Sequence, residues 1–133
     1  VKLKFNLNVG CPKNYRPPKF VMDWVKKNKR KINIFNDPKK AAKNADVVFS
    51  DKVVSLNDKV NKAKKINDFK NYRITSSLMK VTRPQSIFLH CLPRGNEVSE
   101  DVFLGKQSRV WQQALNRAHV QKSILLYCFN KLR

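Results

Sequence analysis

The sequence predicts an α/β domain of three layers, in which helices cover a mainly parallel sheet of about four or five strands and a long helix ends the chain. Three observations support this fold class. Short apolar runs alternate with helical patterns, the links between them are short, and a long periodic stretch comes last. This alternation is typical of parallel strands joined by right-handed crossovers. With 133 residues, the chain is long enough for one domain with a core.

Four strands are expected. Leu3 to Val9 alternates apolar and polar residues, as a strand with one buried face does. Three shorter apolar runs, bounded by turn residues, predict strands at 32–35, 46–49 and 87–89. The last run delivers His90 and Cys91 into a loop that Pro93 closes. Polar groups in that position are typical of the carboxyl end of a buried parallel strand.

Helices are expected between and after these strands. Pro17 and Pro18 suit the first turn of a helix, and the apolar spacing that follows predicts a helix over about 18–28 with Trp24 in the core. Asp37 is a predicted N-cap, with Pro38 at the first helical position. Further helices are expected at 66–69, at 78–81, from 99, and over 110–132, the last packed across the sheet.

Charge is the unusual feature of the composition. The chain has 29 Lys and Arg against 9 Asp and Glu, a net charge of +20. Such a charge favours a polyanionic partner, with nucleic acid ahead of anionic lipid or an acidic protein surface. Codon bias toward lysine is the alternative source of part of this charge. The candidate phosphate-contacting residues are Lys26, Lys27, Lys29, Arg30 and Lys31, although cations also suit the C-terminal end of a helix.

Several classes of protein are disfavoured. Cys11, Cys91 and Cys128 lie far apart, so neither a metal site nor a disulfide framework is expected, and a reducing compartment is. With 3 glycines there is no phosphate-binding loop, and no cofactor is expected. No apolar run approaches the roughly 18–20 residues that span a bilayer. A start at Val1 without a signal-peptide pattern fits a processed product or part of something longer.

Three motifs occur in a characteristic order. They are the segment Asp51 to Asn57 after the third expected strand, the His-Cys-Leu-Pro element from His90, and Asn-Arg-x-His-x-Gln-Lys from Asn116. Together they closely resemble the carboxyl-terminal, ornithine-binding half of the ornithine carbamoyltransferase family, over nearly the whole chain. The resemblance implies a Rossmann-like domain over 1–133 that lacks the amino-terminal carbamoyl-phosphate domain.

The resemblance also implies roles for individual residues. Ornithine would be held by Asp51, Ser55 and Leu56. Cys91 would lie beside the ornithine amines and, with Leu92 and Arg117, would border carbamoyl phosphate. Cys91 and Arg117 are therefore the expected catalytic residues, and the bond from Leu92 to the following proline is expected to be cis.

The residues also admit simpler roles. Asp51 could cap the next segment, Arg117 could be a buried arginine bonded to carbonyl oxygens, and Cys91 could be a small core residue. The chain also departs from the family pattern. Leu56 and Asn57 stand in place of Met and Gly, Val53 in place of Trp, and Leu115 in place of Glu, and the loop after Pro93 is shortened. Without the amino-terminal half, this chain alone is not expected to transfer a carbamoyl group.

Two functions from different classes follow as hypotheses. The first is a non-catalytic descendant that serves, with other protein subunits, as a structural RNA- or polyanion-contacting part of a large assembly, perhaps a mitochondrial ribosome. The second is the ornithine-binding half of a working transferase, in the mitochondrial matrix or the bacterial cytoplasm, whose other half is a separate chain or lies outside this sequence. A regulatory amino-acid-binding module is a third reading.

Overall fold

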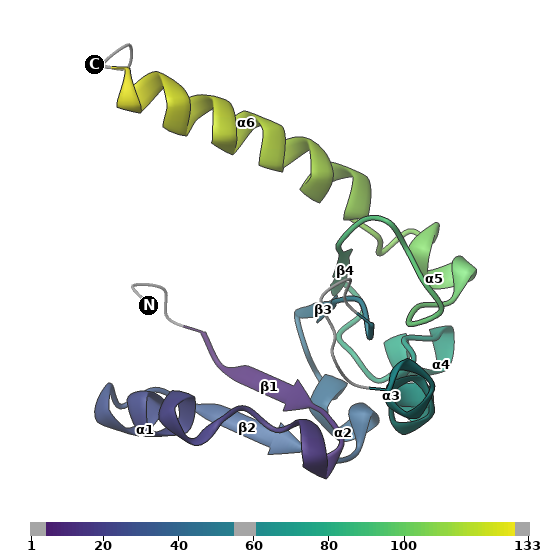
Figure 1. Cartoon of the computed structure of the whole chain (residues 1–133). Helices are drawn as coiled ribbons and strands as arrows, with labels where there is room; N and C mark the ends of the chain where they lie inside the picture. The colour runs from purple at the N-terminus through teal and green to yellow at the C-terminus, as the bar shows by residue number, and fades with distance from the viewer. Residues whose placement is uncertain (1–4, 55–60, 130–133) are drawn as a thin grey trace.

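The computed structural model describes residues 5–54 and 61–129 of the chain. An α/β arrangement with parallel strands and a long C-terminal helix is confirmed (Figure 1). In chain order the elements are β1 (Leu7–Gly10), η1 (Lys13–Tyr15), α1 (Lys19–Lys27), β2 (Ile32–Phe35), α2 (Pro38–Ala42), β3 (Val47–Ser50), α3 (Lys62–Phe69), η2 (Lys70–Tyr72), α4 (Ser76–Met79), β4 (Ile87–His90), α5 (Glu100–Phe103) and α6 (Val110–Cys128).

The strands form two parallel pairs instead of one sheet. β1 pairs with β2, and β3 pairs with β4. In the described part of the chain no strand ladder joins β1 to β3, so the expected continuous sheet is not formed. Figure 1 shows β1 and β2 beside α1, with β3 and β4 on the side of α5 and α6. Each of β1 and β3 therefore keeps one edge without a strand partner.

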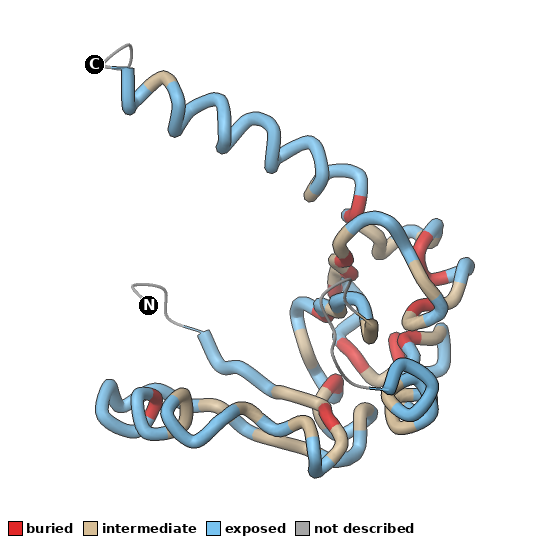
Figure 2. The backbone as a smooth tube through the Cα atoms, viewed as in Figure 1, coloured by how far each residue is buried: buried red, intermediate tan, exposed pale blue. Residues whose placement is uncertain are grey.

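The main core surrounds β4. Phe88, in the middle of this strand, is completely buried. Its N–H donates to the Gln107 carbonyl and its carbonyl accepts from the Arg109 N–H, so both of its main-chain hydrogen bonds go to the segment before α6. The cluster includes ten buried apolar residues, namely Ala42, Val48, Ile74, Leu78, Met79, Phe88, Val98, Val102, Phe103 and Val110. Only Ala42 among them precedes β3. Figure 2 accordingly shows most of the buried backbone around β4, α4 and α5.

The long helix α6 projects from this core. Only Val110, its first residue, is buried, and the expectation that the helix packs across the sheet is wrong. Figures 1 and 2 show α6 running away from both strand pairs with its backbone almost entirely exposed. Its apolar residues predicted a helix, but they are spread around the helix instead of forming one face, so the pattern did not specify a surface for it to cover. The exposed large apolar residues of α6 and its C-cap are Trp111, Leu115, Val120, Ile124, Leu125, Tyr127 and Phe129.

Other differences from the sequence expectations are local. α3 begins at Lys62, four residues before the expected start at 66, because the Asn61 side chain accepts from the Lys64 N–H at 3.2 Å and caps the helix. Trp24 is 45% exposed, so the prediction that it lies in the core is wrong. No helix in the described ranges is both long and apolar enough to cross a bilayer.

Candidate functional site

Two of the predicted site residues meet at the carboxyl ends of β3 and β4. The strand register pairs Ser50 with His90, so the next residues, Asp51 and Cys91, leave the strands side by side. The Cys91 thiol donates to Asp51 Oδ1 at 3.0 Å, and the Lys52 N–H donates to the same oxygen at 2.7 Å. The structure thus places a carboxylate and a thiol together at one strand edge.

The two groups shift each other's pKa in opposite directions. The hydrogen bonds from Cys91 and from the Lys52 N–H lower the pKa of Asp51 below its usual value. Burial, followed by the hydrogen bond to Asp51, raises the pKa of Cys91. At neutral pH the pair is therefore an ionised carboxylate and a neutral thiol. An anion fixed in this way at a strand end can bind an ammonium group.

This coupling predicts how Cys91 reacts with alkylating reagents. Because Asp51 holds the proton on the thiol, Asp51→Asn should lower the pKa of Cys91 and increase the alkylation rate near pH 8. The rate of iodoacetamide labelling at Cys91, followed by peptide mass spectrometry from pH 7 to 10, measures the effect. Asp23→Asn, on α1, is the control and should leave the profile unchanged. An unchanged profile in Asp51→Asn would contradict the coupling.

A buried histidine lies directly beneath the pair. His90 Nδ1 is 2.7 Å from the Ser50 carbonyl oxygen, which can only accept, so this nitrogen carries a hydrogen. Its Nε2 lies 2.8 Å from Glu97 Oε1, within hydrogen-bond distance of that carboxylate oxygen. The Gly95 N–H donates to the same Glu97 oxygen at 2.6 Å. His90 and Glu97 therefore tie the loop after β4 to the end of β3.

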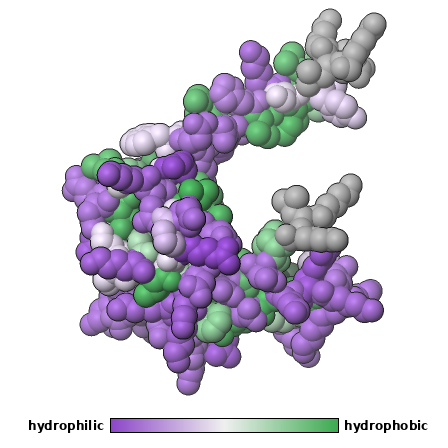
Figure 3. Space-filling view, turned by 180° about the vertical axis from the view of Figure 1, so that it is seen from behind, coloured by the Kyte–Doolittle hydropathy of each residue, from purple (hydrophilic) through white to green (hydrophobic). Residues whose placement is uncertain are grey.

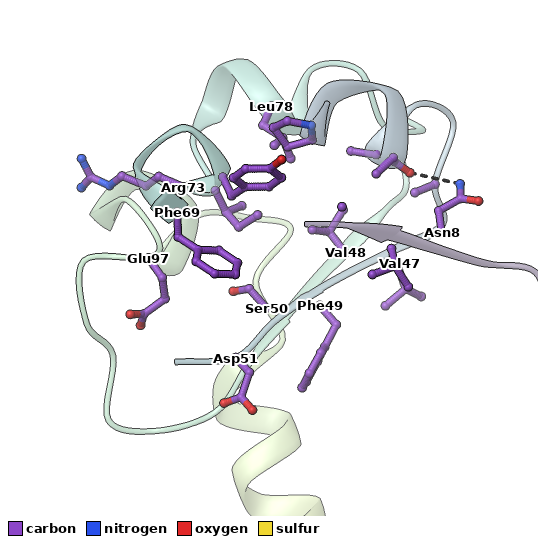
Figure 4. Close-up of a pocket in the computed structure, with 18 of the residues that line it drawn as sticks. Asn8, Val47, Val48, Phe49, Ser50, Asp51, Phe69, Arg73, Leu78 and Glu97 are labelled. Atoms are coloured by element: carbon purple, nitrogen blue, oxygen red, sulfur yellow. Dashed lines mark hydrogen bonds between the residues drawn. The ribbon is translucent and has the colours of Figure 1, made fainter. Parts of the chain in front are cut away.

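Sequence reasoning missed the role of Glu97. The available signal was that one of only 9 acidic residues lies in the short turn that follows the His-Cys-Leu-Pro element. Figure 4 shows Ser50 and Asp51 at the end of β3, with the Glu97 carboxylate in the same region of the hollow. At Gly95 an added Cβ would lie 2.5 Å from Glu97 Oε2, so a side chain there would displace the carboxylate.

Removing this carboxylate should loosen the loop. Glu97→Ala leaves His90 Nε2 and the Gly95 N–H without their hydrogen-bond partner, at an expected cost of about 1–3 kcal/mol in the free energy of unfolding. Urea unfolding of the purified chain measures this value. Glu100→Ala, an exposed acid in the first turn of α5, is the matched control and should cost less than about 1 kcal/mol. Equal losses in both variants would rule out the proposed tie.

A third predicted site residue, Arg117, lies away from this edge. Arg117 is an exposed residue of α6, seven positions after Val110 and so about 10 Å further along the axis. In the described structure no hydrogen bond or ion pair joins it to Asp51 or Cys91, and the alternative that Arg117 is a buried arginine is wrong. Ser55 and Leu56 lie outside the described residues.

Leu92 follows Cys91 and is 43% exposed, and the Leu92–Pro93 peptide bond is cis, as expected. The first turn of α6 is attached nearby, because the His90 N–H donates to Gln113 Oε1 at 3.0 Å. This bond ties the end of β4, where the loop that carries Leu92 begins, to the first turn of α6, while Leu92 itself stays exposed.

A large hollow separates the two strand pairs and reaches Asp51 at its rim. Its volume is about 2280 Å³, and it is lined by β1, β3 and the segments around Phe69 and Glu97 (Figure 4). Small-molecule pockets usually occupy roughly 300–1000 Å³. The hollow is thus too large and open to enclose an amino acid by itself. No group of three or more metal-ligating side chains occurs among the described residues.

The predicted basic cluster lies elsewhere. Lys26 and Lys27 end α1, and Lys29, Arg30 and Lys31 form the turn into β2. All five are exposed. They precede the amino end of β2, whereas Asp51 and Cys91 follow the carboxyl ends of β3 and β4. The cluster is therefore separate from the carboxylate–thiol pair.

Comparison with known proteins gives a consistent result. The model of the "Aspartate/ornithine carbamoyltransferase, Asp/Orn binding domain" family matches residues 1–128. The chain is 41% identical over 128 residues to an ornithine carbamoyltransferase of Ruthia magnifica, covering 95% of this chain and 42% of that protein. The Bradyrhizobium diazoefficiens ornithine carbamoyltransferase is 40% identical over 134 residues, with 99% of this chain and 43% of the relative covered.

Solved structures agree with these sequence relatives. An anabolic ornithine carbamoyltransferase from Campylobacter jejuni aligns with a TM-score of 0.81 and 34% identity, covering 96% of this chain and 44% of that one. The Pyrococcus furiosus ornithine carbamoyltransferase aligns with a TM-score of 0.78 and 33% identity, covering 91% and 41%. The chain spans less than half the length of the relatives it matches.

Proposed function

Because the chain belongs to the aspartate/ornithine carbamoyltransferase family, we propose that it is the ornithine-binding half of an ornithine carbamoyltransferase. The reaction joins ornithine to carbamoyl phosphate and yields citrulline and phosphate. The observation that carries the proposal is the Asp51–Cys91 pair at the strand ends, in a chain whose reported relatives are all named for this enzyme.

The pair supplies what an amino-acid substrate needs. The lowered pKa of Asp51 keeps its carboxylate ionised, so that it can hold a substrate ammonium. The neutral Cys91 thiol lies beside that anion and can contact the same substrate. The free side-chain amine of ornithine would attack the carbamoyl carbon, forming a C–N bond as the C–O bond to phosphate breaks, and the nitrogen would lose a proton to the departing phosphate. Holding the amine in place is the main contribution of this half.

The rest of the site requires a second half. The hollow beside Asp51 is open, Leu92 is exposed, and α6 presents both Arg117 and its apolar residues away from the core. A phosphate-binding half, in the same polypeptide or in a separate chain, would close the site and pack on α6. Figure 3 shows apolar side chains along the projecting helix, interspersed with polar ones, and exposed apolar groups of this kind are expected where a partner covers the helix.

The non-catalytic reading remains a prediction. A structural subunit of a mitochondrial or ribosomal assembly would keep the fold but would not bind a substrate at the Asp51–Cys91 pair. The enzymatic reading is better supported, because the similarity extends through the motifs at Asp51 and Cys91.

Complementation provides the test. This chain would be combined with the amino-terminal half of the Ruthia magnifica enzyme, and citrulline formation from carbamoyl phosphate and ornithine would be measured. Ornithine-dependent citrulline, absent when either half is omitted, is the expected result. A complex of the two halves, verified by gel filtration, that neither forms citrulline nor binds ornithine in calorimetry would overturn the proposal.

A further inference from the structure

We propose that the turn between α1 and β2 binds the phosphate backbone of single-stranded nucleic acid. The name basic turn is used here for Lys26, Lys27, Lys29, Arg30 and Lys31. This inference does not rest on the proposed enzymatic function, because the basic turn lies at the amino end of β2 and away from Asp51 and Cys91.

Positive charge is more concentrated in and before the basic turn than an even spread of the chain's lysines and arginines would give. From Lys19 to Lys31 there are six cationic residues and a single acid, Asp23. The five residues of the basic turn are all exposed. Cations spaced this closely lie within one Debye length of each other, about 8–10 Å at physiological salt, so their fields add. A polyanion with closely spaced charges gains most from such a surface.

Main-chain hydrogen bonds fix the shape of the basic turn. The Lys29 N–H donates to the Lys26 carbonyl, and the Arg30 N–H donates to the Val25 carbonyl, each at 3.0 Å. This is the Schellman arrangement that ends many helices. Lys29 adopts φ 50° at the position where glycine is usual. The turn thus places a lysine at a position where the backbone conformation favours glycine. Its two hydrogen bonds fix the backbone positions of the neighbouring cationic residues relative to one another.

Two exposed aromatic side chains lie on the helix that leads into these cations. Phe20 and Trp24 are 73% and 45% exposed and are four residues apart, so they share one face of α1. Exposed aromatic rings beside a cationic track can stack on unpaired bases without reading their sequence. An anionic membrane is the weaker fit. α1 has only nine residues, and apart from Phe20 and Trp24 its apolar residues, Val21, Met22 and Val25, are partly or fully buried in the fold, so these two rings are all that the helix could insert.

Charge-matched variants of the full chain test the proposal. Lys27, Lys29 and Lys31 would be changed together to Gln, and the control would change Lys39, Lys40 and Lys43, three exposed lysines of α2 and its C-cap. Binding of a fluorescent uridine homopolymer would be followed by anisotropy at several salt concentrations. We expect the first variant to bind roughly tenfold more weakly and its log K against log salt slope to fall by about 2. The control should stay near the original chain.

A single substitution separates binding from folding. Lys29→Gly should raise the thermal unfolding midpoint, since glycine suits φ 50°, and should still weaken RNA binding. If both triple variants lost RNA affinity equally, the net charge of the chain and not the basic turn would account for binding, and the proposal would be overturned. So would RNA binding that does not depend on salt, an absence of RNA binding, or binding to phosphatidylserine vesicles without binding to RNA.

Discussion

Replacing Phe88 with alanine is expected to destabilise the chain by about 3–5 kcal/mol. Phe88 is completely buried in β4, and its ring stacks on the His90 imidazole at a centroid distance of 6.2 Å. Truncation removes this packing and leaves a cavity in the largest apolar cluster of the described chain. Because the cavity lies next to His90, it should also loosen the hydrogen bonds to Ser50 and Glu97. Chemical unfolding monitored by circular dichroism measures the loss.

Phe49→Ala is the matched control for this experiment. Phe49 lies in β3, the partner strand, but is 58% exposed, so its truncation leaves no buried cavity. Its expected cost is below about 1 kcal/mol. If both phenylalanines cost the same, the core would not be centred on β4 as described.

Asp51→Asn is expected to lower the catalytic efficiency of the complemented enzyme roughly 10- to 150-fold. Asparagine has nearly the same shape but lacks the charge, so the variant loses about 1.5–3 kcal/mol of charged hydrogen bonding to the substrate ammonium. The loss should appear mainly in the KM for ornithine, because this contact exists before the reaction begins. Steady-state kinetics with ornithine as the varied substrate measure it.

Two further variants make the result specific. Asp46→Asn removes another acid just before β3, one that forms a surface ion pair with Arg83 at 2.6 Å, and it should leave the kinetics unchanged. Arg117→Ala should raise the KM for carbamoyl phosphate if the second half brings that substrate to α6. An Asp51→Asn enzyme with unchanged kinetics would remove Asp51 from the substrate site.

The sequence predicted local structure better than long-range packing. The strand at 32–35 was predicted with its observed bounds, because a short apolar run between turn residues determines both of its ends. The meeting of Asp51 with Cys91 follows from parallel pairing of two strands that end in these residues. Both features depend on neighbours close in sequence or on a single strand register.

The remaining features depend on surfaces that a pattern does not specify. The apolar spacing of α6 gave the helix but could not show that only Val110 is buried. Trp24 was placed in the core because tryptophan is apolar, yet its helix turns Val25 inward instead. Glu97 was missed because a lone acid in a turn is usually solvated, and only the fold brings it to the His90 ring.

The separation of the two strand pairs bears on how the chain unfolds. Apart from Ala42, the main cluster draws no residue from β1, α1, β2 or α2, and the other buried apolar residues described before β3 are Cys11 and Val25. Main-chain bonds to the rest of the domain include those from Asn44 to Val81 and from Arg83 to Ala45, both near the start of β3. The first strand pair thus has fewer buried apolar residues than the part of the fold around β4, and its local stability is expected to be lower. Local opening of the first strand pair is therefore expected to cost less free energy than opening around β4, so its amide hydrogens should exchange faster than those of β4.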